Sequence, residues 1–310
     1  MAIIDSKGSS GIQESPALIT KNHFEFKSLS DWSYNISYGC SHGCSFCYVP
    51  NTTAIKREIN FEKKGHIPDK WKAERIAGEH WADFHWGEYS IPRAWDEAAF
   101  LKSLQTAENA KKLTPDGNRA IMLCTTTDPY QQLNILGNPE KSKLLNESLR
   151  ALVRNALKLI LEKSTLNVRI LTRSPLAKKD FDLYKKFGNR LMFGMSLPTL
   201  DEKLSGVYEP HAPGPSAKLK VLRAAKEAGL HVYVAMAPTL PDEGRPELTK
   251  LLATIADLKP LTIFHEPINV RAENVARIQI KARELGRPIR GEVFETPSRW
   301  REYAFGQLAL

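Results

Sequence analysis

The segment from position 38 to position 48 reads Tyr38-Gly39-Cys40-Ser41-His42-Gly43-Cys44-Ser45-Phe46-Cys47-Tyr48. It contains three of the four cysteines of the chain, spaced C-x3-C-x2-C. Thiolates are soft ligands that select zinc, copper(I) or iron–sulfur clusters. Three thiolates on a four-iron cluster leave one iron without a protein ligand, and a small molecule can bind there. Gly39 and Gly43 suit a loop around a bulky inorganic group, because glycine tolerates strained backbone angles.

Two simpler interpretations of the cysteines compete with a cluster. A structural zinc site needs a fourth ligand, which His42 or His23 could supply, but the second ligand pair of common zinc motifs is missing. A disulfide framework does not suit a 310-residue chain with four cysteines whose first 20 residues lack an apolar signal core. We therefore predict an iron–sulfur cluster and keep zinc as the alternative.

Composition indicates a cytoplasmic globular protein. A hydrophobic content of 42% is enough for a sizeable core, and 310 residues fit one large α/β barrel. No apolar run reaches the length needed to span a bilayer, so we expect no membrane partner. The net charge is +9, from 44 basic and 35 acidic residues, which is compatible with a nucleic acid partner or with an ordinary basic surface.

Strands and helices alternate along most of the chain. Counting a strand over Trp32–Tyr38, we predict about seven βα units, a pattern typical of a partial or near-complete parallel (β/α) TIM-type barrel. We assign residues 1–30 to an N-terminal extension, 31–285 to the barrel and 286–310 to a C-terminal extension. The predicted strands are 87–93, 120–125, 168–172, 191–197, 231–237 and 261–265, and the predicted helices are 97–112, 141–163, 177–187, 216–228, 246–258 and 272–285.

Residues 60–86 form a less regular insertion that is rich in tryptophan. Trp71, Trp81 and Trp86 lie in or beside it, with His80 and His85 close by. We favour an insertion whose tryptophans pack it onto the barrel, because tryptophan buries a large area. The alternative is an aromatic surface on which the bases of a nucleic acid stack.

Polar residues follow the predicted strands at their carboxyl ends. The sequences are Cys124-Thr-Thr-Thr-Asp128, Thr172-Arg-Ser174 and His265-Glu-Pro-Ile-Asn269, and Ser196 ends another strand. In TIM-type barrels the carboxyl ends of the strands form the active site. The sequence therefore predicts a polar site at this end of the barrel.

The C-x3-C-x2-C motif, followed by an aromatic residue, resembles the motif of the radical S-adenosylmethionine (SAM) superfamily. The order of the further motifs is similar to that in the spore photoproduct lyase family and its uncharacterised relatives. These motifs, which place the resemblance over residues 30–270, are Cys124-Thr-Thr-Thr-Asp-Pro-Tyr130, Ile170-Leu-Thr-Arg173, Met195-Ser196 and Tyr208-Glu209-Pro210.

This resemblance implies a [4Fe–4S] cluster on Cys40, Cys44 and Cys47, with SAM on the open iron. Cleavage of SAM by one electron would give a 5′-deoxyadenosyl radical that abstracts a substrate hydrogen. A flavodoxin or ferredoxin would donate the electron. The residues that the resemblance places around SAM are Tyr48, Thr127, Asp128, Arg173, Ser196 and Glu209.

Cys124 corresponds to a cysteine that, in the lyase, returns a hydrogen atom to the substrate. A simpler interpretation is a small buried hydrophobic residue, which free cysteine commonly is. We predict a radical SAM enzyme that acts on a nucleic acid base, like a DNA-lesion lyase. The alternatives are radical SAM modification of a peptide or small molecule, and a non-catalytic metal-stabilised binding protein. The oligomeric state is left open.

Overall fold

A computed structural model describes most of the chain. The described residues are 13–22, 30–51, 56, 58–65, 67, 69, 71, 80–110, 119–135, 137–240, 244–266, 268–270, 273–287, 295, 296, 298, 299 and 302. His23 and His66 lie outside them, as do most of the predicted extensions at the two ends of the chain. Among the described residues, no helix combines the length and the apolar character needed to cross a membrane.

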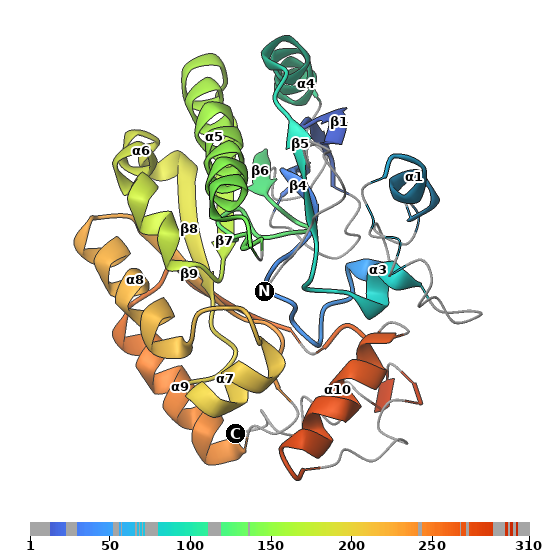
Figure 1. The fold of residues 1–310 in the computed structure, drawn as a ribbon. Helices are drawn as coiled ribbons and strands as arrows, with labels where there is room; N and C mark the ends of the chain where they lie inside the picture. Colours follow the sequence, from blue (N-terminus) through green and yellow to red (C-terminus); the bar gives the residue numbers. More distant parts are fainter. Residues whose placement is uncertain are drawn as a thin grey trace.

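A seven-stranded sheet forms the centre of the molecule, in the order β10-β9-β8-β7-β6-β3-β2 (Figure 1). Neighbouring strands from β3 to β10 pair in parallel, and only β2 is antiparallel. The sheet is open, with β10 and β2 at its edges, so the fold is a partial TIM-type barrel. The strands of this sheet are β2 Ile19–Lys21, β3 Trp32–Tyr34, β6 Ala120–Leu123, β7 Asn167–Thr172, β8 Leu191–Ser196, β9 His231–Met236 and β10 Thr262–His265.

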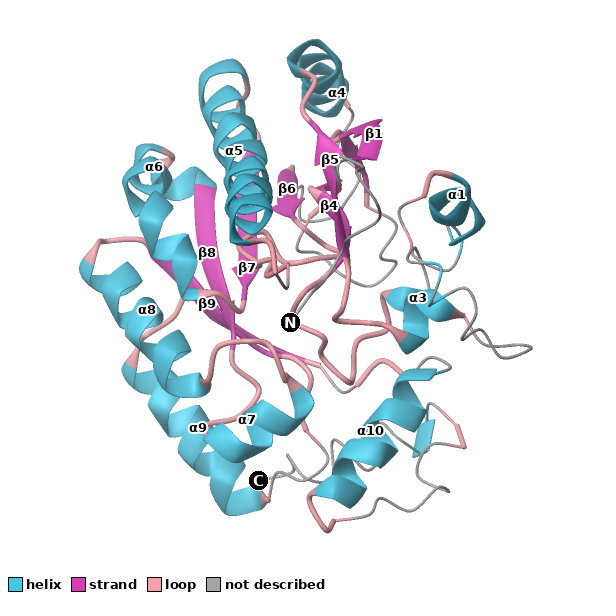
Figure 2. Ribbon diagram, in the orientation of Figure 1, coloured by secondary structure: helices cyan, strands magenta, loops and turns pink. Residues whose placement is uncertain are grey.

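Helices cover one side of this sheet. Figure 2 shows α6, α8 and α9 at the left and α5 between β8 and β6 in this view, whereas α3 and α10 lie at the right. The helices are α1 Glu58–Lys63, α3 Trp81–Phe84, α4 Glu97–Asn109, α5 Pro139–Lys163, α6 Phe181–Lys186, α7 Glu202–Tyr208, α8 Pro215–Glu227, α9 Arg245–Asp257 and α10 Glu273–Glu284, with 3-10 turns at η3 Pro175–Asp180 and η4 Gly188–Arg190.

The predicted strand Trp32–Tyr38 is divided in two. β3 belongs to the large sheet, whereas β4, Ser37–Gly39, pairs antiparallel with β5, Ser90–Ala94, in a small three-stranded sheet completed by β1, Gln13–Pro16. Asn35 at the break binds the next strand end, because its Oδ1 accepts from the backbone N and Oγ1 of Thr126, at 3.0 and 2.9 Å. The strand predicted at 87–93 is therefore not part of the barrel. In the part of the chain that the structure describes, six parallel strands replace the seven units that we predicted.

Helix boundaries follow the capping signals in the sequence. Asp96 caps α4, because its side chain accepts from the backbone N of Ala99 at 2.9 Å. Asn138 caps α5, because its side chain accepts from the backbone N of Lys141. Pro139 is in the first turn of α5, where its missing N–H costs no hydrogen bond. Helix α7 was not predicted, and the helix predicted at 177–187 is a 3-10 turn, η3, that continues as α6.

The tryptophans of the insertion are buried, as the packing interpretation predicted, but among the described residues they pack on the small sheet and the cysteine loop and not on the barrel. Trp71, Trp81 and Trp86 are buried in one cluster with Phe61 and Tyr89, beside the cysteine loop. The indole rings of Trp71 and Trp81 lie 6.3 Å apart. This packing holds the insertion against the loop between Gly39 and Tyr48.

Candidate active site

The cysteine loop begins directly after β4 and lines a cavity of about 220 Å³. Cys40 and Cys44 are buried and Cys47 is half-buried, and all three line this cavity. The fourth cysteine, Cys124, lines it too. All four are free thiols, so the disulfide interpretation is wrong.

Glycines allow the loop to turn closely against the insertion. Gly39 and Gly43 have φ angles of 82° and 61°, as expected for a strained loop. A Cβ on Gly39 would lie 2.5 Å from Tyr89, and a Cβ on Gly87 would lie 2.6 Å from the Cα of Gly43. Side chains at these positions would push the cysteine loop away from the insertion.

The three thiols of the loop fit a cluster better than a single ion. Among the described residues, no three His, Cys, Asp or Glu side chains converge on one metal ion, as zinc would require. Three cysteines that bind three separate irons need no such convergence. Burial raises the pKa of Cys40, Cys44 and Cys47 to about 12, so the thiolates need a positively charged group in the cavity. The irons of a cluster supply that charge.

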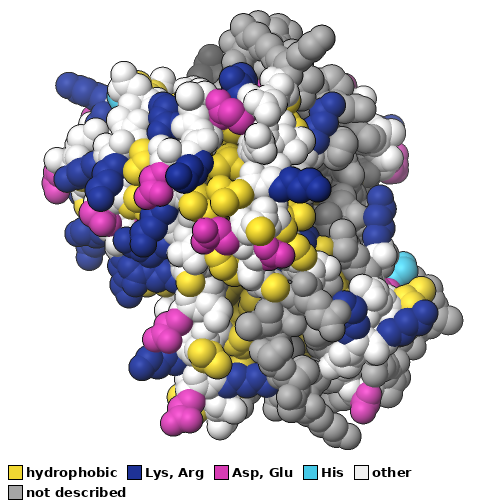
Figure 3. Space-filling view, turned by 90° about the horizontal axis from the view of Figure 1, so that it is seen from above, with side chains coloured by type: hydrophobic (Ala, Val, Ile, Leu, Met, Phe, Trp, Pro, Cys, Tyr) yellow, Lys and Arg dark blue, Asp and Glu magenta, His cyan; other side chains and the backbone are white. Residues whose placement is uncertain are grey.

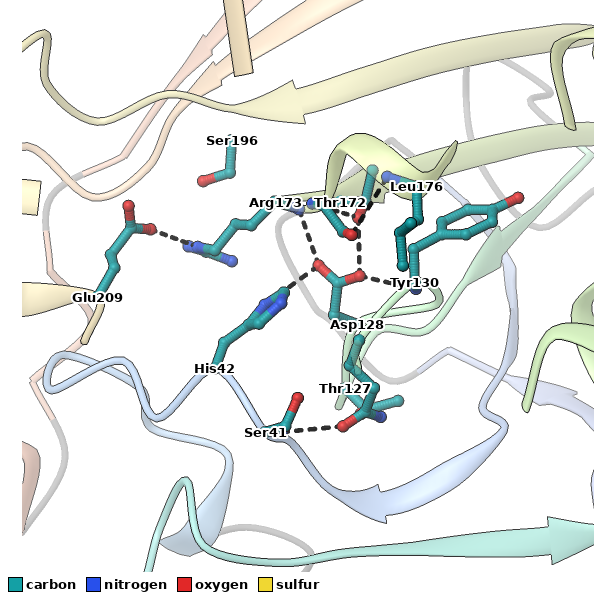
Figure 4. A network of polar contacts seen from close by, with 12 residues as sticks. Ser41, His42, Thr127, Asp128, Tyr130, Thr172, Arg173, Leu176, Ser196 and Glu209 are labelled. Carbon is teal, nitrogen blue, oxygen red and sulfur yellow. Dashed lines mark hydrogen bonds and ion pairs between the residues drawn. The ribbon is translucent and has the colours of Figure 1, made fainter. Parts of the chain in front are cut away.

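Asp128 joins three parts of the site (Figure 4). Its Oδ1 accepts from the Oγ1 of Thr172 at 2.7 Å and from the backbone N of Tyr130 at 2.8 Å. Its Oδ2 accepts from the backbone N of Arg173 at 2.8 Å. The Nδ1 of His42 lies 3.5 Å from Oδ2. Asp128 lines the cavity, and its carboxylate links the loops of the site by accepting hydrogen bonds from the end of β7. Its contact with SAM stays a prediction.

The hydroxyl group of Thr127 also forms hydrogen bonds within the site. Its Oγ1 donates to the carbonyl of Gly39 at 2.7 Å and accepts from the Nε2 of Gln131 at 2.7 Å. The Oε1 of Gln131 in turn accepts from the backbone N of Ser41 at 2.9 Å. Thr127 and Gln131 therefore fix the start of the cysteine loop.

Arg173 extends from the end of β7 into the cavity and is backed by two buried charges. Its Nε donates to the Oε1 of Glu209 at 2.5 Å, and Glu209 also forms an ion pair with Lys218. Glu209 and Lys218 are fully buried. Burial by itself would raise the pKa of Glu209, but Lys218 and Arg173 outweigh it and lower this pKa to about 2. The carboxylate thus stays ionised and keeps the guanidinium in place.

The remaining predicted residues differ in their positions. Tyr48 lines the cavity. Ser196 is buried, donates to the carbonyl of Ala237 at 3.4 Å, and is not among the residues that line the cavity. Cys124 directly follows β6 and has a φ of 61°, in the left-handed region that non-glycine residues rarely adopt. Such strain persists where the surrounding structure enforces it, often at functional sites.

Sequence reasoning missed several residues that organise the site. Lys218 lies in a predicted helix on the same face as Val221, Leu222 and Ala225, which are all buried. A lysine on an apolar face of a helix needs a buried anion, and this signal could have paired it with Glu209. Asn35 and Gln131 gave no such signal, because their partners come from distant parts of the chain.

Comparisons with known proteins agree with this arrangement. Residues 34–255 match the profile of the Radical SAM superfamily. The chain is 32% identical over 261 residues to an uncharacterized protein of Acidianus two-tailed virus, covering 82% of this chain and 72% of that protein. It is 26% identical over 225 residues to an uncharacterized protein of Mycobacterium tuberculosis, covering 70% of this chain and 53% of the other.

Similar solved structures include the spore photoproduct lyase. The lyase complexed with dinucleoside spore photoproduct aligns with a TM-score of 0.55 at 13% identity, covering 94% of this chain and 78% of the lyase. A variant with bound AdoMet and the same dinucleoside aligns with a TM-score of 0.54 at 14% identity, covering 91% and 76%. At this identity the likeness establishes the fold. The profile match covers residues 34–255, which is most of the chain. It shows that the chain belongs to the radical SAM superfamily, whose cofactors are a [4Fe–4S] cluster and SAM.

Proposed function

We propose that this radical SAM enzyme abstracts a hydrogen from a nucleic acid base, as a lyase for a damaged or modified base would. The observation that carries the proposal is the position of Cys124. Its side chain lines the same cavity as Cys40, Cys44 and Cys47, although its backbone must adopt a left-handed conformation there. A thiol is a ready source of a hydrogen atom, and this supports a role for Cys124 in completing a radical reaction on a substrate in this cavity.

Different residues that line the cavity have different roles in the proposed reaction. When bound, the cluster and SAM supply one-electron chemistry that yields a carbon-centred radical able to remove a substrate hydrogen. Cys40, Cys44 and Cys47 hold the cluster. Arg173 uses its Nε on Glu209, which leaves its terminal nitrogens to pair with the carboxylate of SAM.

Cys124 acts on the substrate after its hydrogen has been removed. The substrate radical first breaks the bond that joins the two parts of the lesion, which moves the unpaired electron to another carbon. The S–H bond of Cys124 then breaks and a C–H bond forms at that carbon, which leaves a thiyl radical. An electron from a donor of the flavodoxin or ferredoxin class and a proton from solvent restore the thiol. Burial raises the pKa of Cys124, so the sulfur keeps the hydrogen that this step needs.

A nucleobase fits the walls of the cavity. Five aromatic residues contribute to the lining, Phe46, Tyr48, Trp86, Tyr233 and Phe264. Flat bases stack on aromatic rings without regard to sequence, and each stacked base contributes about 1–3 kcal/mol. The net charge of +9 adds a general attraction for a polyanion.

The distribution of charge favours a second candidate, a peptide or small-molecule substrate. Figure 3 shows Lys and Arg side chains gathered at the left, the side on which Figure 1 places α6 and α8. Exposed lysines there include Lys178, Lys179, Lys185 and Lys186. Among the described residues that line the cavity, Arg173 is the only Lys or Arg. A small substrate would need no further cations.

Two experiments test the proposal in sequence. After anaerobic reconstitution and reduction with dithionite, the parent protein should release 5′-deoxyadenosine from SAM, and Cys40→Ala should not. Equal release by Cys40→Ala would contradict the assignment of the cluster ligands.

The second experiment tests the nucleic acid substrate. We expect binding to DNA that carries a methylene-bridged thymine dimer to weaken steeply with salt, because binding releases counterions from the phosphates. The dimer should be split, and Cys124→Ala should change the products while SAM cleavage continues. Weak, salt-insensitive DNA binding together with an unaltered dimer would favour the second candidate.

A further inference from the structure

Helix α10 binds three successive carbonyls of the cysteine loop. The Nε of Arg277 donates to the carbonyl of Ser45 at 3.1 Å, and one of its terminal nitrogens donates to that of Cys47. Between them, the Nδ2 of Asn274 donates to the carbonyl of Phe46 at 3.0 Å. These carbonyls belong to the turn from which Cys44 and Cys47 project, so α10 fixes the backbone of two cluster ligands.

The same arginine also joins the insertion to the loop. The other terminal nitrogen of Arg277 forms an ion pair with Asp83 in α3. Asp83 is buried, and the side chain of Arg277 is 20% exposed. One guanidinium therefore connects α3, the cysteine loop and α10, which Figure 1 shows side by side at the lower right. This contact gives the insertion a role beyond the packing of its tryptophans.

Apolar packing supports this junction on two sides. Cys44 and Phe46 are in one cluster with Ile278 of α10 and Leu204 of α7. Cys40 is in a second cluster with the tryptophans of the insertion. Helix α10 lies beyond residue 255, where the superfamily match ends, so this part of the support comes from outside the matched domain.

We propose that Arg277 and Asn274 are positioning residues for the iron–sulfur cluster, and that Asp83 sets the charge that the cluster experiences. The proposal rests on the assignment of the cluster to Cys40, Cys44 and Cys47, and it is independent of the substrate. Groups that orient metal ligands typically change metal affinity 10–100-fold when they are removed.

The charge of Arg277 acts on the cluster as well as on the loop. One terminal nitrogen of Arg277 donates to the carbonyl of Cys47, so the guanidinium places a positive charge beside a residue that would bind the cluster. A reduced cluster carries one more negative charge than an oxidised one, so a nearby cation favours reduction. Asp83 counteracts this effect because it neutralises part of the charge of Arg277.

Variants of the three residues separate geometry from charge. Arg277→Lys keeps the positive charge but loses the planar fork that reaches three acceptors. Arg277→Met loses both the charge and the fork, and Asp83→Asn leaves the fork in place. Asn274→Leu loses the hydrogen bonds to the carbonyls of Phe46 and Asn269 but leaves Arg277 unchanged. Lys281→Met is the matched control, since Lys281 is on the same helix and forms its ion pair with Glu284, one turn further along that helix.

The measurements are made on the reconstituted full-length protein without substrate. We expect iron loss to a chelator to be about 10–100-fold faster in Arg277→Met than in Lys281→Met, and intermediate in Arg277→Lys and Asn274→Leu. In a titration followed by electron paramagnetic resonance, the midpoint potential should fall in Arg277→Met and rise in Asp83→Asn.

Two results would overturn the proposal. One is iron loss in Arg277→Met and Asn274→Leu at the rate of Lys281→Met. The other is an unchanged midpoint potential in Asp83→Asn, a variant that keeps the fold because the fork still has an acceptor. A parent protein that binds no iron would refute the cluster assignment itself, whereas a failure on DNA would leave these measurements unaffected.

Discussion

Glu209 illustrates how a single buried carboxylate can organise a cofactor pocket. It is fully buried between Arg173 at the cavity and Lys218 on α8. Removing one partner of a buried ion pair costs about 3–5 kcal/mol, because it leaves an uncompensated charge. The family resemblance puts Glu209 near SAM, but the structure places it behind Arg173, where it orients the residue that faces the cavity.

The depressed pKa of Glu209 predicts a loss of stability in acid. Its pKa is about 2 in the folded protein and 4.5 ordinarily, so protonation favours the unfolded state. The stabilisation of about 3 kcal/mol is nearly complete above pH 5, and more than half of it is lost by about pH 3. Urea unfolding at about pH 5, 4 and 3 measures this loss.

The matched control for this prediction removes both charges of the buried pair. The double variant Glu209→Gln with Lys218→Met leaves no buried titrating carboxylate at this position. Its stability should fall less between about pH 5 and pH 3 than that of the parent, by about 2 kcal/mol. Parallel pH profiles of the two proteins would contradict the role of Glu209.

The contact between Gly43 and Gly87 predicts that the cysteine loop tolerates no side chain there. In Gly87→Ala the new Cβ would lie 2.6 Å from the Cα of Gly43, so the loop must shift. Gly65→Ala is the control, since Gly65 also has a positive φ, of 68°, but no atom of the described residues lies within 4 Å of the place that a Cβ would take. Both variants carry backbone strain of about 1 kcal/mol, but we expect only Gly87→Ala to bind less iron after reconstitution. Equal iron contents would show that the loop can move without loss of the cluster.

At the scale of elements, helix α5 shows how a periodic pattern is confirmed in most positions and wrong in one. In the sequence 141–163, apolar residues at three- and four-residue spacing predict one apolar face that includes Leu144, Leu145 and Leu149. Leu145 and Leu149 are only 2% and 1% exposed, but Leu144 is 61% exposed. Leu144 is next to Leu145 in the sequence, about 100° around the helix, and this rotation takes it past the edge of the buried stripe.

This difference yields a prediction with an internal control. Leu149→Ala should lower the free energy of unfolding by about 2–5 kcal/mol, because it leaves a cavity in the core. Leu144→Ala should change it by less than about 0.5 kcal/mol, because the side chain is in solvent. Urea denaturation of the two variants distinguishes them, and similar losses would mean that α5 is rotated relative to the structure.

At the scale of the whole molecule, the open sheet predicts a gradient of stability from its centre to its β10 edge. Strands β7 and β8 are paired on both sides, whereas β10 is an edge strand with half-buried and exposed side chains. Amide hydrogens exchange through local opening, which is easiest where few apolar contacts must break. We expect hydrogen exchange to be slowest in β7 and β8 and faster in β10. Equal protection across these strands would indicate that β10 is covered.

The sequence alone determined the family and most of the elements. The C-x3-C-x2-C spacing, the polar strand ends and the helical periodicity are local patterns, and local patterns depend on residues that are close in the chain. They predicted the parallel barrel and the cap at Asp96, which the structure confirms, and the three cluster ligands, which stay a prediction. Domain boundaries and the roles of residues around SAM stay predictions.

Only the tertiary structure decided which residues from distant parts of the chain contact one another at the site. The division of the strand at Asn35, the burial of Lys218 against Glu209 and the contacts of Arg277 with the cysteine loop each join segments that are far apart in sequence. A single sequence does not record which of many possible partners will satisfy a buried polar group. That choice is made when packing brings one donor and one acceptor together and excludes water from both.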